Sequence, residues 1–238
     1  GYLYDEPHFL LQQEVSEVGS YFSIIKAIAA GNHKLSSIAS VLEVKSTNLT
    51  KYLKTLMDLD ILERRVPVTE ENPEKSKRGL YKIKDNYLRF WFAFIYPNMS
   101  FIESGHSGIV MDKIRRGLTT SHIGFVYEDI CQERMWELNV NNAWPFQFSK
   151  LGGYWDAKNE IDIAALDPEG QNLILGECKY WKEPVGLNVL HALEAKACDV
   201  AWERDRRKVW YVLFSISGFS DELRNHAATR DDLLLIDD

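Results

Sequence analysis

The chain has 238 residues, of which 45% are hydrophobic, so it is long enough to bury one large core or two smaller ones. Its most apolar window, NYLRFWFAFIYP, is shorter than the ~20 residues of a membrane span and contains Arg89. The polar opening GYLYDEPH is unlike a signal peptide. These features argue against membrane and secreted proteins, and we expect a soluble globular protein of the cytoplasm.

The net charge of −7 is unevenly distributed along the chain. Residues 1–95 carry a formal charge of +1, whereas residues 96–238 carry −8. Clustered carboxylates are the ligands that hard divalent cations bind, so the acidic half is where we expect a metal site. Three cysteines without CxxC spacing indicate reduced thiols inside a cell and argue against a zinc finger.

The first part of the chain has the pattern of three helices. Apolar residues at helical spacing predict a helix over residues 16–32, which ends at Gly and Asn, a short helix over 35–44 and a third over 46–59. Ser46 is the expected N-cap of the third helix. Its predicted buried stripe consists of Leu49, Leu53 and Leu56.

A predicted β-hairpin follows these helices. The segments ILERRVPV and LYKIKD flank the charged loop TEENPEKSKRG. Three helices followed by such a hairpin resemble a winged helix-turn-helix, so residues 1–95 are expected to form this domain. The residues that would then contact DNA are Thr47, Asn48, Lys51 and Lys54 on the third helix, and Lys77 and Arg78 in the wing. Docking of a protein partner stays open as the alternative.

The remaining sequence predicts a helical connection over residues 96–120 and an α/β domain over 121–238. The aromatic segment before the connection, DNYLRFWFAFIYPN, is expected to form a buried helix. In the second domain a helix, three strands, a helix, a strand and a closing helix follow one another, which indicates a mixed central sheet. The apolar positions of its first helix are Phe125, Ile130, Met135 and Leu138.

The hairpin EIDIAALDPEGQNLILGECKYW carries charged residues inside two apolar strands. A four-residue turn, DPEG, would pair Leu166 with Gln171. Because side chains alternate between the faces of a strand, Asp162, Glu177 and Lys179 then share one face. The two carboxylates are expected to be diagonal neighbours with backbones ~7–8 Å apart, close enough to bind one cation.

This combination of charges has a chemical use. Mg²⁺ is usually bound by one or two carboxylates together with waters and substrate phosphate. It lowers the pKa of a bound water and offsets charge on a phosphate, while Lys179 could orient the attacking water or stabilise the developing anion. The residues therefore predict Mg-dependent phosphodiester hydrolysis.

The order of these residues resembles the PD-(D/E)XK, or restriction-endonuclease-like, nuclease superfamily. Glu128 lies on a predicted helix, Asp162 in EID, and Glu177 and Lys179 in ECK. The resemblance implies that Asp162 and Glu177 bind Mg or Mn, that the carbonyl of Cys178 completes the metal site, that Lys179 is catalytic and that Glu128 assists.

Other residues near the motif carry weaker expectations. Ile161 stands where the superfamily name has Pro. Lys196, on the following helix, is a candidate for a phosphate contact, and with the winged-helix residues it completes the expected DNA-binding set. Trp155 and Trp181 flank the motif, and we expect both to pack in the core.

The whole chain is also similar to the C-terminal half of archaeal-type P-loop ATPases. The segments that carry this similarity are YKIKDNYLRFWFAFIYPN, FVYEDI, NEIDIAAL, LGECKYW and LFSISGFSDEL. The resemblance implies an upstream ATPase domain that this chain lacks, since no GxxxxGK[ST] motif occurs and the sequence begins with Gly.

The sequence leaves several functional alternatives open. Nuclease folds also persist as inactive scaffolds, and a winged helix can bind a protein partner or act as a DNA-binding regulator. The sequence does not decide between DNA and RNA as substrate, although DNA is the expected partner, nor does it decide whether the chain forms a homo-oligomer.

Overall fold

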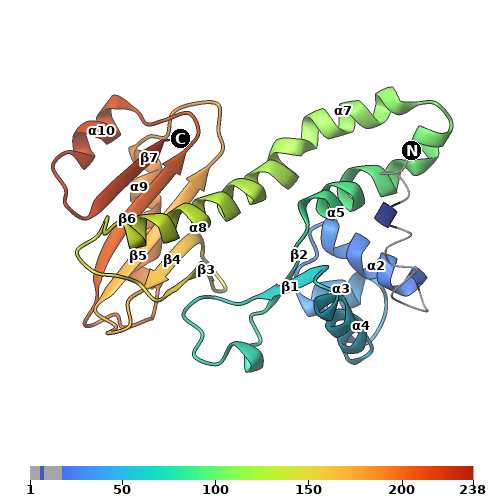
Figure 1. Cartoon of the computed structure of the whole chain (residues 1–238), viewed down its shortest axis with the longest axis horizontal. Coiled ribbons are helices and arrows are strands. Elements are labelled where there is room, and N and C mark those ends of the chain that lie inside the picture. The colour runs from blue at the N-terminus through green and yellow to red at the C-terminus, as the bar shows by residue number, and fades with distance from the viewer. Residues whose placement is uncertain (1–5, 8–17, 238) are drawn as a thin grey trace. The chain divides into compact units, whose positions relative to one another are not determined.

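The structure, a computed structural model, describes residues 6–7 and 18–237 (Figure 1). The chain divides into two compact units. The first holds the described residues up to Arg65 together with Lys77–Leu118, and the second holds Val66–Ser76 and the residues from Thr119 onward. Within the described part of the chain, no helix is long and apolar enough to cross a membrane.

The first unit begins with three helices and a small antiparallel sheet, in the order that the sequence predicts. These elements are α2 (Val18–Ala29), α3 (Leu35–Val41), α4 (Ser46–Asp58), β1 (Leu62–Arg65) and β2 (Leu80–Ile83). Chain reversal after α2 occurs at Gly31, whose φ of 93° favours glycine. The expectation that Ser46 caps α4 is wrong, because Lys45 is the extended N-cap residue and its carbonyl accepts from the Asn48 N–H.

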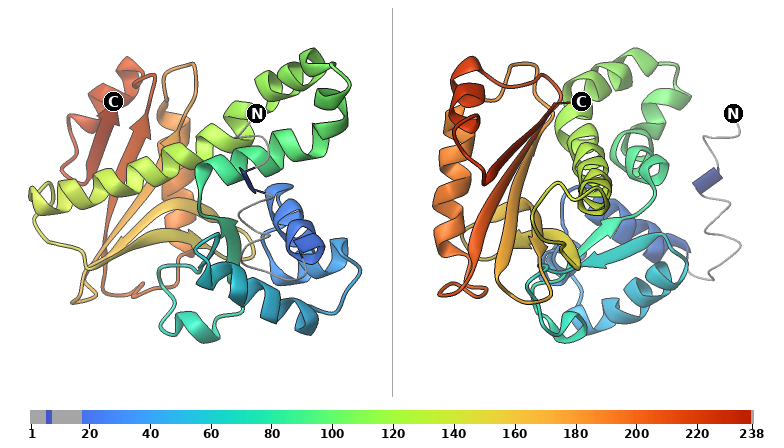
Figure 2. Two further views of the ribbon diagram at one scale, coloured as in Figure 1. Left: turned by 45° about the vertical axis from the view of Figure 1, so that its right-hand side comes forward. Right: turned by 60° about the vertical axis from the view of Figure 1, so that its left-hand side comes forward.

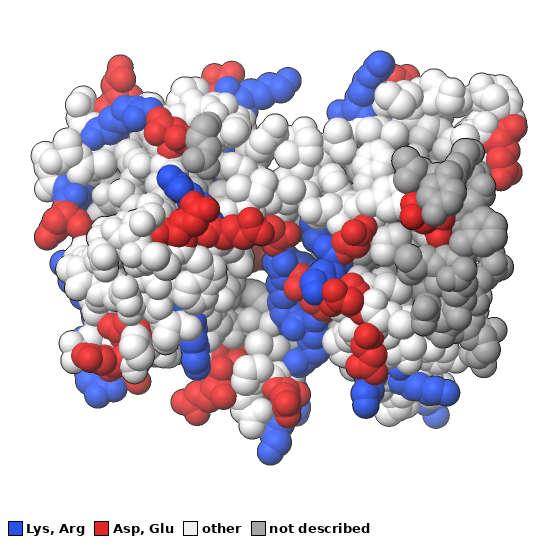
Figure 3. All heavy atoms as spheres, in the orientation of Figure 1, with Lys and Arg blue, Asp and Glu red and all other residues white. Residues whose placement is uncertain are grey.

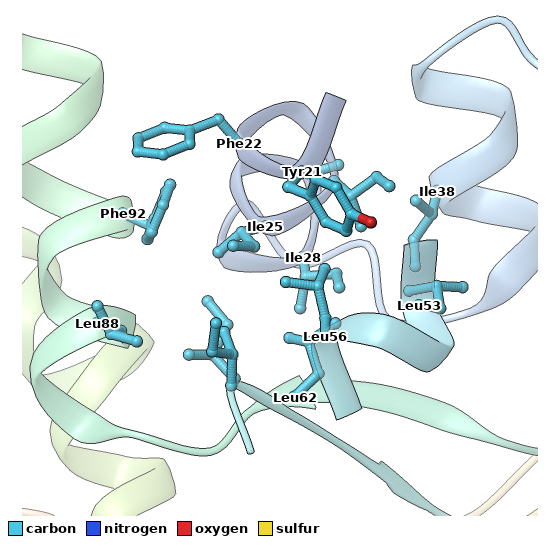
Figure 4. Packing of buried hydrophobic residues seen from close by; sticks show 14 of the residues in the cluster. Tyr21, Phe22, Ile25, Ile28, Ile38, Leu53, Leu56, Leu62, Leu88 and Phe92 are labelled. Carbon is cyan, nitrogen blue, oxygen red and sulfur yellow. The ribbon is translucent and has the colours of Figure 1, made fainter. Parts of the chain in front are cut away.

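Apolar side chains from these elements form one core (Figure 4). Leu49, Leu53 and Leu56 of α4 are buried in it, as the helical spacing predicts. Ile25 and Ile28 of α2 belong to the same cluster. The hairpin strands cover part of this core, and Leu62 of β1 is buried there.

The aromatic segment after β2 forms consecutive short helices, and its expected burial is confirmed. They are α5 (Asn86–Phe90), a π-helical turn η2 (Trp91–Ile95) and a 3₁₀ turn η3 (Tyr96–Asn98). Trp91 and Phe92 are buried, and their rings lie 6.1 and 5.1 Å from the ring of Phe22. Edge-on and tilted rings at these distances add to the stability that burial supplies.

The first unit ends with two further helices, α6 (Met99–Glu103) and α7 (Ser107–Leu118). They occupy most of the stretch for which the sequence predicts a helical connection. Val110 is the buried residue of α7. The loop between β1 and β2 contains a 3₁₀ turn, η1 (Pro73–Lys75), and the part of this loop up to Ser76 groups with the second unit.

The second unit is an α/β structure around a mixed five-stranded sheet. The strands lie side by side in chain order, with β3, β4 and β5 antiparallel and β5, β6 and β7 parallel. Their bounds are β3 (Lys150–Trp155), β4 (Glu160–Leu166), β5 (Asn172–Lys179), β6 (Lys208–Ser215) and β7 (Leu233–Asp237). β7, formed by LLLID, is an edge strand that the sequence did not predict.

Helices cover both faces of this sheet (Figure 2). On one face lies α8 (Gly124–Val140), which follows the π-helical turn η4 (Thr119–Ile123), and on the other lie α9 (Leu187–Asp199) and α10 (Asp221–Ala227). In α8, Tyr127, Cys131 and Met135 are buried at a spacing of four residues. Ile130, expected on the apolar face, is 49% exposed, because it lies outside this stripe.

Candidate functional site

The site is built on the central hairpin of the sheet, β4 and β5. Ile163 pairs with Gly176 and Leu166 with Leu173, so the predicted pairing of Leu166 with Gln171 is wrong by two residues. The error comes from the turn, which is longer than DPEG. Since a shift of two residues preserves the alternation of side chains, the charged residues stay on the predicted face.

The turn is extended by the side chain of Asp167. Its carboxylate accepts from the Gln171 N–H at 2.9 Å and from the Asn172 side-chain amide at 2.7 Å. Gly170, within the turn, has a φ of 72°, a backbone conformation that favours glycine. These bonds hold Gln171 in the turn, so the ladder begins with Leu173 opposite Leu166.

A β-bulge lies at Asp162. Gly152 pairs with Ala164 and Tyr154 pairs with Ile161, so two residues of β4, Asp162 and Ile163, lie opposite the single residue Gly153 of β3. The Asp162 carboxylate accepts from the Cys178 N–H at 2.8 Å, and its carbonyl accepts from Gln132 Nε2 of α8 at 3.4 Å. Bulges often redirect a side chain beside an active site, and this one aims the carboxylate at the end of β5.

Four charged side chains meet at this point on the α9 face of the sheet. Glu177 is bonded to both Lys179 and Lys196, the latter at 2.6 Å. Lys179 Nζ also lies 3.5 Å from Asp162 Oδ2, and Lys196 Nζ donates to the Glu160 carbonyl at 2.7 Å. The Glu177 side chain is 7% exposed, whereas those of Asp162 and Lys196 are 17% and 29% exposed, so the cluster opens to solvent on one side.

The two carboxylates have opposite shifts in pKa. Burial and the neighbouring Glu177 charge raise the pKa of Asp162, against the opposing effect of Lys179. Burial would also raise the pKa of Glu177, but the two lysines outweigh burial and lower it. Burial acts to lower the pKa of Lys179, yet Asp162 and Glu177 reverse this effect and raise it. At neutral pH Lys179 is therefore a cation that can donate hydrogen bonds but does not accept a proton.

Asp162 and Glu177 fit a small divalent cation. Both supply carboxylate oxygens from adjacent strands, and a cation between them would oppose the burial and the Glu177 charge that raise the pKa of Asp162. No group of three or more His, Cys, Asp and Glu side chains suited to a metal occurs among the described residues. A bound ion would therefore depend on these two carboxylates, a main-chain oxygen and waters.

Glu128 and Cys178 were predicted to contribute from the helix and the strand. Glu128 lies on α8, and its charge is among the causes that raise the pKa of the Cys178 thiol, after burial and the neighbouring Cys131 thiol. The Cys178 side chain packs in the core on the α8 face. Only the main chain of Cys178 is thus available on the side of the carboxylates.

The predicted DNA-binding residues of the first unit are exposed. They are Thr47, Asn48, Lys51 and Lys54 on α4, and Lys77 and Arg78 before β2. On the face drawn in Figure 3, Lys and Arg side chains are interspersed with Asp and Glu. The ammonium of Lys196, predicted to contact phosphate, donates to the Glu177 carboxylate and to the Glu160 carbonyl.

Sequence reasoning missed two further groups at the site. Gln132 lies one helical turn after Glu128, and this spacing on one helix face was the available signal. Trp181, expected in the core, is 47% exposed. Its position directly after a charged strand end could have indicated a place at the rim of the site.

Three comparisons bear on this chain. Residues 91–197, which include α8, the hairpin and most of α9, match DUF234, a family described as archaeal and bacterial proteins of unknown function. The chain is 40% identical over 178 residues to an uncharacterized protein of Methanocaldococcus jannaschii. That alignment covers 75% of this chain and 39% of the relative, so the chain spans about two fifths of the relative's length.

A solved structure, the crystal structure of a repair endonuclease from Pyrococcus abyssi, is similar over 43% of this chain and 44% of that one. The sequence identity is 13% and the TM-score is 0.29, a similarity too low to support an argument. By its sheet and its charged cluster the chain is an α/β protein with two carboxylates and two lysines at one point, and it is similar to a family of unknown function.

Proposed function

We propose that the second unit is a cytoplasmic, metal-dependent nuclease of the PD-(D/E)XK type that hydrolyses phosphodiester bonds in DNA. The observation that carries this proposal is the convergence of Asp162, Glu177 and Lys179 at one partly exposed point. Asp162 and Glu177 are 15 positions apart in the sequence, and a bulge and a strand end bring them together. Packing alone gives no reason to bury three ionisable groups in this place.

Each residue then has a distinct role. Asp162, fixed by the Cys178 N–H, and Glu177 would hold Mg²⁺ or Mn²⁺ together with the Cys178 carbonyl. The bound ion would supply Lewis acidity and a more acidic water. Lys179 would donate to the attacking water or to the phosphate oxygen that gains charge. Lys196 orients the Glu177 carboxylate through its 2.6 Å bond, and Glu128 would assist from α8.

The first unit would deliver DNA to this site. In this proposal α2, α3, α4 and the β1–β2 hairpin form a winged helix-turn-helix, and the exposed residues of α4 read a groove. Lys77 and Arg78 would bind phosphates. As the ATPase resemblance implies, a P-loop ATPase domain, which this chain lacks, would be a partner of both units.

A cleavage assay tests the nuclease proposal. Labelled DNA and RNA are incubated with the protein in Mg²⁺, in Mn²⁺ and in a chelator, and Glu177→Gln and Lys179→Met are compared with the wild type. Glu169→Gln is the matched control, because Glu169 is an exposed carboxylate in the turn of the same hairpin. We expect cleavage only with metal, a loss of at least ~10²-fold in both site variants and no change in the control. Metal-independent cleavage that survives both site variants would contradict the proposal.

A second candidate function is an inactive scaffold that binds a partner through its first unit. It is favoured by one observation, namely that Lys179 and Lys196 already neutralise Asp162 and Glu177. In a scaffold this cluster is purely structural, so Mg²⁺ would not raise the unfolding temperature. A ligand that binds the native state stabilises it by mass action, so a shift that grows with metal concentration separates the two candidates.

A further inference from the structure

Exposed large apolar side chains directly follow the ends of β5 and β6. Tyr180 is 36% exposed and Trp181 is 47% exposed, and Ile216, at the end of the neighbouring strand β6, is 39% exposed. Large aromatic side chains are normally buried, and those left exposed are enriched where a protein binds a partner. The surface formed by Tyr180, Trp181 and Ile216, called the aromatic rim below, is therefore a candidate binding surface next to the site.

The ring of Trp181 borders the site itself. Lys179 Nζ lies 5.7 Å from the centroid of the Trp181 ring. The same ammonium is bonded to Glu177 and lies 3.5 Å from Asp162 Oδ2. A phosphate held at the carboxylates and Lys179 would thus have an exposed indole within reach of the adjoining nucleotide.

The backbone around Trp181 is fixed although its side chain is exposed. The Ile216 N–H donates to the Lys179 carbonyl at 3.3 Å, and Ser217 Oγ donates to the Trp181 carbonyl at 2.5 Å. Tyr180 lies on the other side of the strand end, where its ring meets Tyr127 of α8 edge-on at 5.6 Å. Trp181 is thus the exposed aromatic residue on the side of the cluster, and hydrogen bonds fix its main chain.

We infer that Trp181 stacks on an unpaired nucleobase beside the cleaved phosphate, so that the site takes single-stranded or flapped nucleic acid in preference to continuous duplex. This inference rests on the proposed nuclease function. In a duplex the faces of the bases are covered by their neighbours, so an indole reaches one only where a base is unpaired. Stacking tolerates any base, so we expect little dependence of the cleavage rate on base sequence.

The test compares three substrates of the same sequence: a single strand, a duplex with a single-stranded flap and a blunt duplex. The wild type should cleave the first two faster than the third. Trp181→Ala should lower kcat/KM on these two substrates by about 5- to 150-fold, the equivalent of one stacked base, and leave the blunt duplex nearly unchanged. Trp181→Phe should retain an intermediate rate, because a smaller ring still stacks.

Trp136→Ala is the matched control. Trp136 is similarly exposed, at 44%, but it lies on α8 and packs against Phe148, on the far side of the sheet from the cluster. We expect Trp136→Ala to cleave all three substrates like the wild type. Equal rates of the wild type and Trp181→Ala on every substrate would overturn the stacking inference and leave the nuclease proposal standing.

If none of the three substrates is cleaved in the presence of Mg²⁺ or Mn²⁺, the nuclease proposal fails. A binding measurement then tests separately whether Trp181 stacks on a base. Short oligothymidylate should quench tryptophan fluorescence in the wild type and in Trp136→Phe, but much less in Trp181→Phe. Equal quenching in the wild type and both variants, or no quenching in any of them, would overturn the stacking inference. Absence of quenching is also the result expected if the aromatic rim docks a protein.

Discussion

Replacing each carboxylate of the site by its amide should change stability in opposite directions. Glu177→Gln removes the negative charge between Lys179 and Lys196 and one of the two oxygens to which they donate, and leaves two partly buried ammonium groups beside one carboxylate. Asp162→Asn removes a carboxylate whose ionisation is disfavoured, since burial and Glu177 raise its pKa. The amide oxygen of Asn can still accept the bond from the Cys178 N–H.

The size of each effect follows from burial. Breaking a buried ion pair by removing one partner costs about 3–5 kcal/mol, and the 19% and 29% exposure of the two lysines argues for the lower end, about 3 kcal/mol. Relieving the Asp162 charge should stabilise the protein by about 1 kcal/mol. At roughly 2–4 °C per kcal/mol for a chain of this length, Glu177→Gln should melt about 6–12 °C lower and Asp162→Asn about 2–4 °C higher.

Thermal unfolding of the full chain, followed by circular dichroism at neutral pH in a chelator, measures both shifts. Glu169→Gln is the control, with an expected shift near zero. Adding Lys196→Met to Glu177→Gln should recover part of the loss, because it removes one of the unpaired charges. A fall in melting temperature for Asp162→Asn as large as that for Glu177→Gln would refute the reasoning that the Glu177 charge stabilises the fold and the Asp162 charge destabilises it.

Three further outcomes can be checked. The pKa of Glu177 is lowered in the folded protein, so its carboxylate stabilises the fold at a pH above the pKa of an unfolded glutamate. This stability is lost as the pH falls through the lowered pKa of the folded state, so the difference in melting temperature between the wild type and Glu177→Gln should vanish in acid. Alkylation at pH 8 followed by mass spectrometry should label the exposed Cys198 and spare Cys131 and Cys178, which are buried. Burial also raises the pKa of the Cys178 thiol, so fast labelling of Cys178 would contradict its burial in the core. Lys51→Ala should weaken duplex DNA binding and reduce the slope of log K against log salt by about 1 in a fluorescence titration, whereas an unchanged slope would argue that α4 does not contact phosphate.

The alternation of side chains was enough to predict the face of the site. Any even shift of the β4–β5 register keeps Asp162, Glu177 and Lys179 on the same face of the sheet, so the predicted face was right despite an error of two residues in the pairing. The error itself arose from the Asp167 side chain, whose bonds to Gln171 and Asn172 lengthen the turn. Hydrogen bonds made by a turn side chain are not visible in a hydrophobic pattern.

Other features depend on contacts that sequence spacing does not contain. The bulge at Asp162 follows from the pairing of β4 with β3, and the bond from Lys196 to Glu177 joins a helix to a strand 19 positions away. The exposure of Ile130 depends on which side of α8 meets the sheet. The three helices and the hairpin of the first unit were predictable because their cores follow local helical and strand periods.

Anomalous diffraction from crystals grown in Mn²⁺ tests the proposed metal site most directly. We expect one strong peak in contact with the carboxylates of both Asp162 and Glu177, at about 2.0–2.2 Å, the range for small divalent ions with oxygen ligands. We also expect Lys179 or Lys196 to give up its bond to Glu177 in that crystal. Crystals in which no peak lies at these carboxylates, and both lysines remain bonded to Glu177 at saturating metal, would show that Asp162 and Glu177 do not bind a metal ion.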